Sequence, residues 1–239
     1  MQTEKILGIN VSVADYYEFK EDIRAKIQNN EKITIASANP EIMLQSRKDE
    51  KLQQIINSAT YAIPDGIGVV YASKILGGNI KERVTGIDLM YELCDLAVQS
   101  GLSVFLYGAK PGVAKKVAVK LQQQYPGITI AGYIDGYEQD KNKIINAINE
   151  SKAKMVFVAL GAPRQEYWIY ENADKVCGLI FEGVGGSFDV ISGNIKRAPM
   201  WIQNHGFEWL YRLIIEPTRF FRQLRLVKFI FTILFSSRH

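Results

Sequence analysis

The sequence predicts an α/β fold in which helices flank a parallel sheet and a basic, amphipathic helical appendage follows at the C-terminus. Three observations predict it: β-rich runs alternate with helical patterns, polar and glycine-rich loops follow the expected strands, and positive charge is concentrated near the end of the chain. With 239 residues, of which 47% are hydrophobic and 23% charged, the chain can bury the core that one such domain needs.

The expected strands are short apolar runs, and longer amphipathic segments lie between them. We expect strands at residues 6–13, 33–37, 61–63, 104–107, 129–133, 155–159 and 179–184. We expect helices at residues 15–29, 41–58, 67–76, 87–100, 112–125, 141–151 and 165–173. No repeat or low-complexity linker interrupts this alternation. Residues 1–197 are therefore expected to form one core domain, and residues 198–239 a helical appendage that associates with a membrane.

Five loops follow expected strands, at residues 37–39, 64–66, 108–112, 161–165 and 183–186. Ligands of open α/β sheets collect at the carboxyl ends of the strands, where glycines such as Gly108 and Gly185 let a backbone approach a ligand closely. A single glycine-rich turn is more often only a turn, but five at one edge of a sheet indicate a ligand site. No GxGxxG follows a strand and no GxxxxGK[ST] occurs, so neither the dinucleotide fingerprint nor the P-loop is present.

Asp65 lies between Pro64 and Gly66, directly before an apolar helical segment. A carboxylate in this place is commonly a helix N-cap. The other interpretation is a general base that accepts a proton from a sugar hydroxyl, as an inverting sugar transfer requires. The sequence leaves both interpretations open.

Arg83 follows Glu82, but adjacent residues do not face each other on a regular element, so a role toward phosphate is favoured over a pair with Glu82. When a nucleotide sugar reacts, its diphosphate leaves and the developing charge must be stabilised. No Asp-x-Asp occurs in the sequence. We therefore expect arginines and helix N-termini in place of a metal, and no cofactor. His205 and His239 lie too far from any serine or cysteine elbow to predict a hydrolase triad.

The C-terminal fifth carries the positive charge, because residues 196–239 contain eight Lys and Arg against two Glu, whereas the whole chain has a net charge of +4. The apolar stretch at 226–235 spans ten residues including Lys228, but a membrane-spanning helix needs about 20. An interfacial helix on anionic lipid is favoured, and packing on the core is the alternative. Nucleic acid is not an expected partner, since no recognised binding module accompanies the tail.

The cellular location follows from two negative observations. Cys94 and Cys177 show neither CxxC spacing nor a disulfide framework, which fits a reducing compartment. Residues 1–5 do not begin a secretory signal. We expect a cytoplasmic protein, peripheral on the inner face of the cell membrane.

Taken together, these segments resemble the WecG/TagA/CpsF family of bacterial glycosyltransferases, glycosyltransferase family 26. The resemblance covers nearly the whole chain and is specific through the order and number of its segments: SANPEI at 37–42, PDGIGVV at 64–70, ERVTGIDLM at 82–90, YGAKPGVA at 107–114, YPGI at 125–128, VALGAPRQEYWI at 158–169, GVGGSFDVISGNIKRAP at 183–199 and EWLYRLIIEPTRFFR at 208–222. It implies a Rossmann-like core, metal independence and inversion at the anomeric carbon. For the TagA kind of member, it implies transfer of N-acetylmannosamine from its UDP conjugate to N-acetylglucosaminyl-diphospho-undecaprenol, a linkage-unit step of wall teichoic acid synthesis.

The resemblance also implies roles for single residues. Asp65 matches the proposed base, and the positions that match polar groups around the donor sugar and diphosphate are Asn39, Arg83 and Gln165. Ser37 stands where the family commonly has threonine and keeps the hydroxyl. The positions that match the uridine site are Tyr137, Gly185 and Asp189. The tail arginines expected to close over the site at the membrane are Arg212, Arg219 and Arg222.

Two alternatives remain open. The same fold could use another donor, UDP-N-acetylmannosaminuronic acid or UDP-glucose, for polysaccharide synthesis, or the protein could be a UDP-binding module at the membrane that never turns over. The expected partners are a UDP-sugar donor, an undecaprenyl-diphosphate-linked acceptor and the membrane surface. The sequence does not decide whether the protein forms a homo-oligomer.

Overall fold

The computed structural model of the protein describes residues 1–204, 208–215 and 220–236. Its centre is a parallel six-stranded sheet in the order β4-β3-β8-β7-β5-β6. The strands are β3 (Ile33–Ala38), β4 (Tyr61–Pro64), β5 (Ser103–Gly108), β6 (Thr129–Ile134), β7 (Met155–Ala159) and β8 (Ile180–Gly183). The predicted α/β class with a parallel sheet flanked by helices is confirmed.

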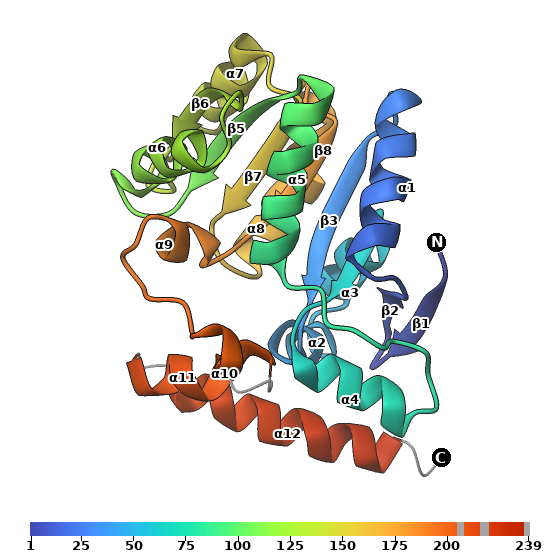
Figure 1. The fold of residues 1–239 in the computed structure, drawn as a ribbon. Coiled ribbons are helices and arrows are strands. Elements are labelled where there is room, and N and C mark those ends of the chain that lie inside the picture. Colours follow the sequence, from blue (N-terminus) through green and yellow to red (C-terminus); the bar gives the residue numbers. More distant parts are fainter. Residues whose placement is uncertain (205–207, 216–219, 237–239) are drawn as a thin grey trace.

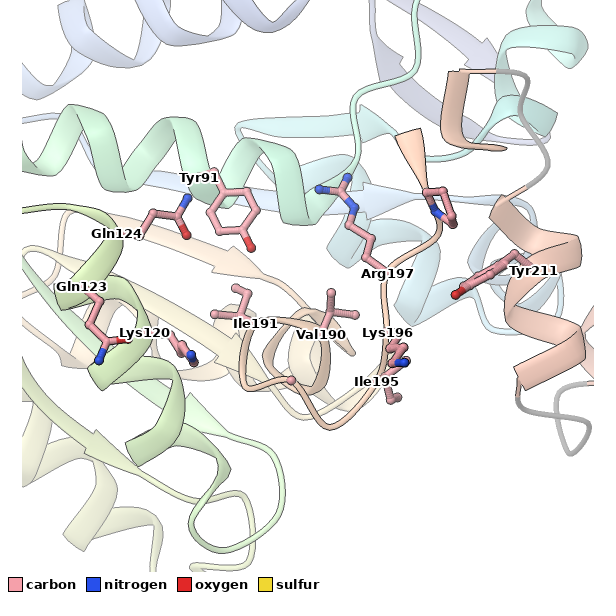
Figure 2. A pocket seen from close by; sticks show the side chains of 12 residues that line it. Tyr91, Lys120, Gln123, Gln124, Val190, Ile191, Ile195, Lys196, Arg197 and Tyr211 are labelled. Carbon is pink, nitrogen blue, oxygen red and sulfur yellow. The ribbon is translucent and has the colours of Figure 1, made fainter. Parts of the chain in front are cut away.

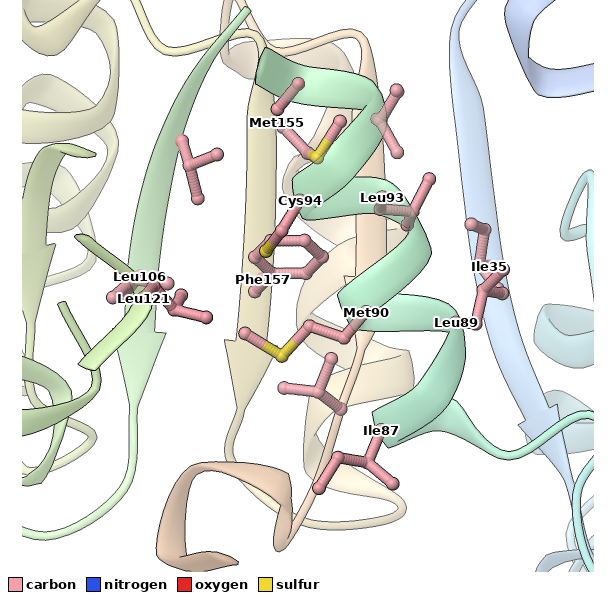
Figure 3. Close-up of a cluster of buried hydrophobic side chains, with 14 of the residues drawn as sticks. Ile35, Ile87, Leu89, Met90, Leu93, Cys94, Leu106, Leu121, Met155 and Phe157 are labelled. Carbon is pink, nitrogen blue, oxygen red and sulfur yellow. The ribbon is translucent and has the colours of Figure 1, made fainter. Parts of the chain in front are cut away.

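Helices cover both faces of the sheet (Figure 1). One face carries α1 (Tyr16–Gln28), α5 (Gly86–Ser100) and α6 (Val113–Gln124), and the other carries α3 (Glu50–Ser58), α7 (Lys141–Ser151) and α8 (Arg164–Asn172), which the 3₁₀ turn η1 (Ala173–Lys175) follows. In the core between α5 and the sheet, Met90 and Cys94 approach Phe157 (Figure 3). This packing fixes the first turn of α5 above the ends of the central strands.

The segment predicted as a strand at residues 6–13 is instead an antiparallel hairpin of β1 (Thr3–Ile6) and β2 (Ile9–Ser12). Between them, Leu7 (φ 48°) and Gly8 (φ 90°) adopt left-handed conformations that turn the chain back on itself. The hairpin packs near β4 without joining the large sheet.

The helix predicted at residues 41–58 is two helices, α2 (Pro40–Ser46) and α3. The break occurs because Asp49 adopts an extended conformation and its side chain accepts a hydrogen bond from Leu52 N–H at 3.0 Å, which starts α3 afresh. An internal aspartate that competes for the backbone in this way is a capping signal that amphipathic periodicity alone does not register.

The C-terminal part comprises α9 (Ser187–Ile191), α10 (Met200–Asn204), α11 (Glu208–Ile215) and α12 (Phe220–Ser236). Helix α12 lies against α2 and α4 (Ile67–Ile75), as Figure 1 shows. Phe229 and Ile233 are fully buried there, and Arg225 forms an ion pair with Glu41 of α2. Among the described residues, no helix is long and apolar enough to cross a membrane.

The opposite face of α12 is apolar and exposed. The exposed side chains are Val227, Ile230, Phe231, Leu234 and Phe235. Helix α12 is therefore apolar on two sides, one packed on the core and one turned to solvent. Exposed apolar side chains also occur on neighbouring helices, namely Tyr71 and Ile75 on α4 and Met200 and Trp201 on α10. Such a concentration of exposed apolar groups marks an interaction surface.

Candidate active site

The candidate site lies where β3, β4 and β8 end, next to the start of α5. Because successive residues of a strand alternate between the two faces, Ser37 on β3 and Glu182 on β8 lie on the face that α5 covers. A Cβ atom placed on Gly86, the first residue of α5, would lie 3.3 Å from Ser37 Oγ and 3.8 Å from Glu182 Oε1. Two strands and one helix start therefore bring their polar groups to one point.

Asp65 follows β4 directly and its loop is fixed on the neighbouring strand. Its backbone N–H lies 3.1 Å from Ala38 O and 2.8 Å from Ile63 O. The N-cap of α4 is Gly66 (φ 102°), and no side chain caps this helix. The N-cap interpretation of Asp65 is therefore wrong.

Tyr16 of α1 connects Asp65 to the start of α5. Its hydroxyl accepts a hydrogen bond from Thr85 N–H at 2.8 Å, and Thr85 is the N-cap of α5. Burial raises the pKa of Tyr16 to about 12, and the negative charges of Asp88 and Asp65 add to this effect. The Asp65 carboxylate is therefore close enough to Tyr16 for its charge to be felt there.

Asn39 has a structural role at the neighbouring helix start. Its side-chain oxygen accepts hydrogen bonds from Glu41 N–H at 3.1 Å and Ile42 N–H at 3.0 Å, which caps α2. With its oxygen used for the cap, the amide nitrogen is the Asn39 group that could donate to a ligand. Contact between Asn39 and a donor sugar stays a prediction.

Gln165 holds the loop after β8. Its side chain is 3% exposed, and its Oε1 accepts a hydrogen bond from Gly185 N–H at 2.9 Å. A Cβ on Gly183 would lie 2.7 Å from Gln165 Nε2, so glycine is needed there for this packing. Gln165 thus shapes the loop at Gly185, and a direct contact with a substrate stays a prediction.

Three other predicted residues lie farther along the sheet, in the direction from β4 toward β6: Gly108, Tyr137 and Asp189. Gly108 ends β5 with φ 123°, and Tyr137 follows β6 with 64% of its surface exposed. Asp189 lies in the first turn of α9, where its Oδ1 is 3.4 Å from Asn194 Nδ2. Since β4 and β6 are the two outer strands, Asp65 and Tyr137 mark the ends of an elongated row of loops. A row of this shape suits an extended ligand.

Arg83 joins the core to the C-terminal part. Its Nη1 lies 3.3 Å from Glu208 Oε2 of α11, and the two side chains are only 20% and 10% exposed. The sequence argument against a pair with Glu82 agrees with this geometry, but it could not identify a partner 125 residues away. Arg212 and Arg222 lie in α11 and α12, where their side chains are not described, and Arg219 lies outside the described residues.

A pocket of about 750 Å³ opens beside this row, between α5, α6, the segment after α9 and α11 (Figure 2). Its walls include two tyrosines, Tyr91 and Tyr211, and three cations, Lys120, Lys196 and Arg197. Arg197 also donates to Asp88 on α5 at 2.6 Å. Among the described residues that line the pocket none is acidic, so its charge favours an anion.

Glu182 is the residue that the sequence analysis missed. It is 1% exposed, and within the described part of the chain neither of its carboxylate oxygens has a hydrogen-bond partner. The available signal was a single acidic residue inside the apolar run at 179–184. Among the described residues, no group of three or more His, Cys, Asp or Glu side chains could hold a metal ion.

Comparisons with known proteins give consistent results. Residues 4–239 match the family described as "Glycosyl transferase WecG/TagA/CpsF family". The chain is 39% identical over 242 residues to a Bacillus subtilis (strain 168) protein named N-acetylglucosaminyldiphosphoundecaprenol N-acetyl-beta-D-mannosaminyltransferase, and the match covers 100% of this chain and 94% of that protein. A protein of the same name from Bacillus spizizenii (strain ATCC 23059 / NRRL B-14472 / W23) is 37% identical over 239 residues, covering 100% of this chain and 93% of the relative.

Proposed function

Because the chain belongs to the WecG/TagA/CpsF family of glycosyl transferases, we propose that it moves N-acetylmannosamine from UDP-N-acetylmannosamine to N-acetylglucosaminyl-diphospho-undecaprenol with inversion at the anomeric carbon. The two Bacillus relatives carry names that state this acceptor and this sugar. The product is the linkage unit of wall teichoic acid. The observation that carries the proposal is the position of the Asp65 carboxylate, which directly follows β4 at the carboxyl edge of the sheet and does not cap the helix that follows.

In the proposed reaction, Asp65 acts as the general base. It takes the proton of the acceptor hydroxyl while the hydroxyl oxygen attacks the anomeric carbon of the donor. The bond between that carbon and the UDP oxygen breaks on the opposite face, and its electron pair leaves with UDP. A single attack from the far side inverts the anomeric centre, so the mechanism needs one base and no covalent intermediate.

The diphosphate that leaves needs positive charge. Arg83 is the cation tied to α11, and Lys196 and Arg197 lie in the pocket beside the site. The first turn of α5 adds backbone N–H groups that have no partner within the helix. These groups support a transfer without a metal, and the absence of an Asp-x-Asp sequence agrees. Addition of EDTA should then leave the rate unchanged.

The exposed apolar face of α12 supports a peripheral position on the cytoplasmic face of the membrane. Phe231 and Phe235 suit the acyl boundary, while the exposed Lys228 suits anionic headgroups. The acceptor is anchored in the same membrane by its undecaprenyl chain. Lipid contact through α12 would therefore bring the site and the acceptor to one surface.

The test compares wild-type protein with Asp65→Asn and with the control Asp174→Asn, whose carboxylate is 96% exposed and lies on the far side of the core. Release of UDP from UDP-N-acetylmannosamine is measured with a lipid-diphosphate-GlcNAc analogue. Loss of the base should lower kcat by about 10² to 10⁴ while UDP still binds, and the control should match wild type. Equal rates for Asp65→Asn and wild type would refute the assignment of the base.

Three other outcomes lead to different conclusions. Turnover only with UDP-N-acetylmannosaminuronic acid or UDP-glucose would keep the mechanism and change the donor. Binding of UDP and liposomes without turnover on any donor of the panel would instead establish a non-catalytic module. Chelation by EDTA that abolished turnover would overturn the metal-independent mechanism.

A further inference from the structure

Glu182 is a buried carboxyl group that the proposed reaction does not use. It lies on β8 in the middle of the sheet, with Ile35 of β3 and Phe157 of β7 as its register partners. Both partners are apolar, and no described residue forms a hydrogen bond with either Glu182 oxygen. A buried polar group without a partner is rare in a folded protein and calls for an explanation.

The surroundings of Glu182 determine its protonation. A carboxylate anion that is removed from water without a cation or a hydrogen-bond donor is strongly disfavoured. Burial first, and the negative charge of Asp65 second, raise the pKa of Glu182 well above its ordinary value. These surroundings favour the protonated, neutral form of Glu182, which adds no negative charge beside Asp65.

The titratable groups that face Glu182 come from two elements. Asp65 approaches from the end of β4, and Cys94 approaches from α5. Burial raises the pKa of the Cys94 thiol as well, so Cys94 is also uncharged. The neighbouring strands β3 and β7 contribute Ser37, Ile35 and Phe157, which do not titrate.

The distances around Gly86 show where Glu182 lies relative to the first turn of α5. Ser37 Oγ and Glu182 Oε1 approach the same point at the first turn of α5. This turn is one of the proposed partners of the donor diphosphate. A charge on Glu182 would therefore act directly on a bound dianion in a medium of low dielectric constant.

We propose that Glu182 is a positioning residue for donor binding, which stays neutral so that the diphosphate of a nucleotide sugar can bind beside Asp65. The inference rests on the proposed function. When the pH rises far enough for the Glu182 O–H bond to ionise and the proton to pass to solvent, the site carries a second negative charge. The donor then binds more weakly.

The test measures donor affinity by calorimetry from about pH 6 to about pH 9 with UDP-N-acetylmannosamine, whose diphosphate keeps its charge in this range. Wild-type protein, Glu182→Gln and Glu182→Leu are compared with the control Glu150→Gln, an exposed carboxylate on α7. In wild type and in the control, the donor Kd should rise toward high pH, by up to about tenfold per pH unit once Glu182 ionises. In both Glu182 variants the donor Kd should stay within about twofold of its value at pH 6.

Three results would overturn the inference: a parallel loss of affinity in wild type and Glu182→Gln, a constant Kd in wild type, or a Kd of Glu182→Gln that is already tenfold higher than that of wild type at pH 7.

Thermal unfolding gives an independent readout of the protonation of Glu182. Relative to wild type, Glu182→Gln should gain stability as the pH rises, because in wild type the folded protein holds the Glu182 proton that the unfolded chain releases. Failure of wild type to bind the donor at any pH would refute the proposed function, whereas the unfolding comparison would still test the neutral state of Glu182.

Discussion

Replacement of Glu166 by glutamine should stabilise the protein at neutral pH. Glu166 lies on α8 with 4% of its surface exposed, and its Oε2 has no hydrogen-bond partner. Its Oε1 accepts one hydrogen bond, from Gln165 Nε2 at 3.0 Å. Burial raises the pKa of Glu166 to about 7, against an ordinary value of 4.5.

The sign and size of the effect follow from this pKa. Below pH 4.5 both the folded and the unfolded protein hold the Glu166 proton, so the group does not alter stability. Between pH 4.5 and about 7 only the folded protein holds it, and the free energy of unfolding falls by about 1.4 kcal/mol per pH unit. The total loss is about 3 kcal/mol at pH 7, and it stays constant above.

A glutamine has nearly the shape of the protonated glutamate and never ionises. Glu166→Gln should therefore equal wild type near pH 4 and exceed its free energy of unfolding by about 3 kcal/mol at pH 8. The pH-dependent contribution of Glu182 to the free energy of unfolding is the same in both proteins, so it cancels in the comparison. Urea unfolding followed by circular dichroism at several pH values measures the difference, with Glu150→Gln as the exposed control. A difference that does not change between pH 4 and pH 8 would refute the assignment of a buried, neutral Glu166.

Three further predictions follow from packing and charge. Phe229→Ala, on the buried side of α12, should lower the free energy of unfolding by about 3 to 5 kcal/mol. Phe231→Ser, on the exposed side, should leave the free energy of unfolding unchanged in chemical denaturation. It should instead reduce co-sedimentation of the protein with liposomes. Gly108→Ala should lower stability by at least about 2 kcal/mol, because its Cβ would lie 2.4 Å from a backbone oxygen of β7. The control Gly112→Ala, also at positive φ but with nothing within 4 Å, should cost about 1 kcal/mol in the same thermal unfolding assay. Arg83→Gln should reduce kcat about a hundredfold, and an unchanged kcat would remove this arginine from the proposed phosphate contacts.

The sheet could be predicted from the sequence because most of its strands are short apolar runs, three of which end in proline or glycine: β4, β5 and β8. Strand β7 is buried throughout, and such strands appear as continuous apolar runs. The hairpin at the N-terminus was missed because two left-handed residues, Leu7 and Gly8, divide a run that otherwise looks like one strand. A leucine rarely adopts that conformation, so no composition rule identifies the turn.

The candidate site could be predicted only in part. The loops could be placed at one edge because parallel strands bring their carboxyl ends together. The partner of Arg83 could not be predicted, because Glu208 belongs to a helix whose position depends on packing against the rest of the fold. Asp65 illustrates the same limit: whether a carboxylate before a helix is its cap depends on which residue takes the N-cap conformation, and here Gly66 does.

The position of α12 has a consequence for how the protein would find its acceptor. Helices α2 and α4, on which α12 lies, both start at the carboxyl ends of strands, and the arrowheads of β3 and β7 point toward the end of the molecule that carries α10, α11 and α12 (Figure 1). A protein that rests on lipid through α12 would hold its candidate active site at a constant height above the bilayer. The search for a lipid-anchored acceptor would then be lateral diffusion in two dimensions. Turnover would follow the surface density of the acceptor, so dilution with inert phospholipid at a fixed bulk amount would slow the reaction.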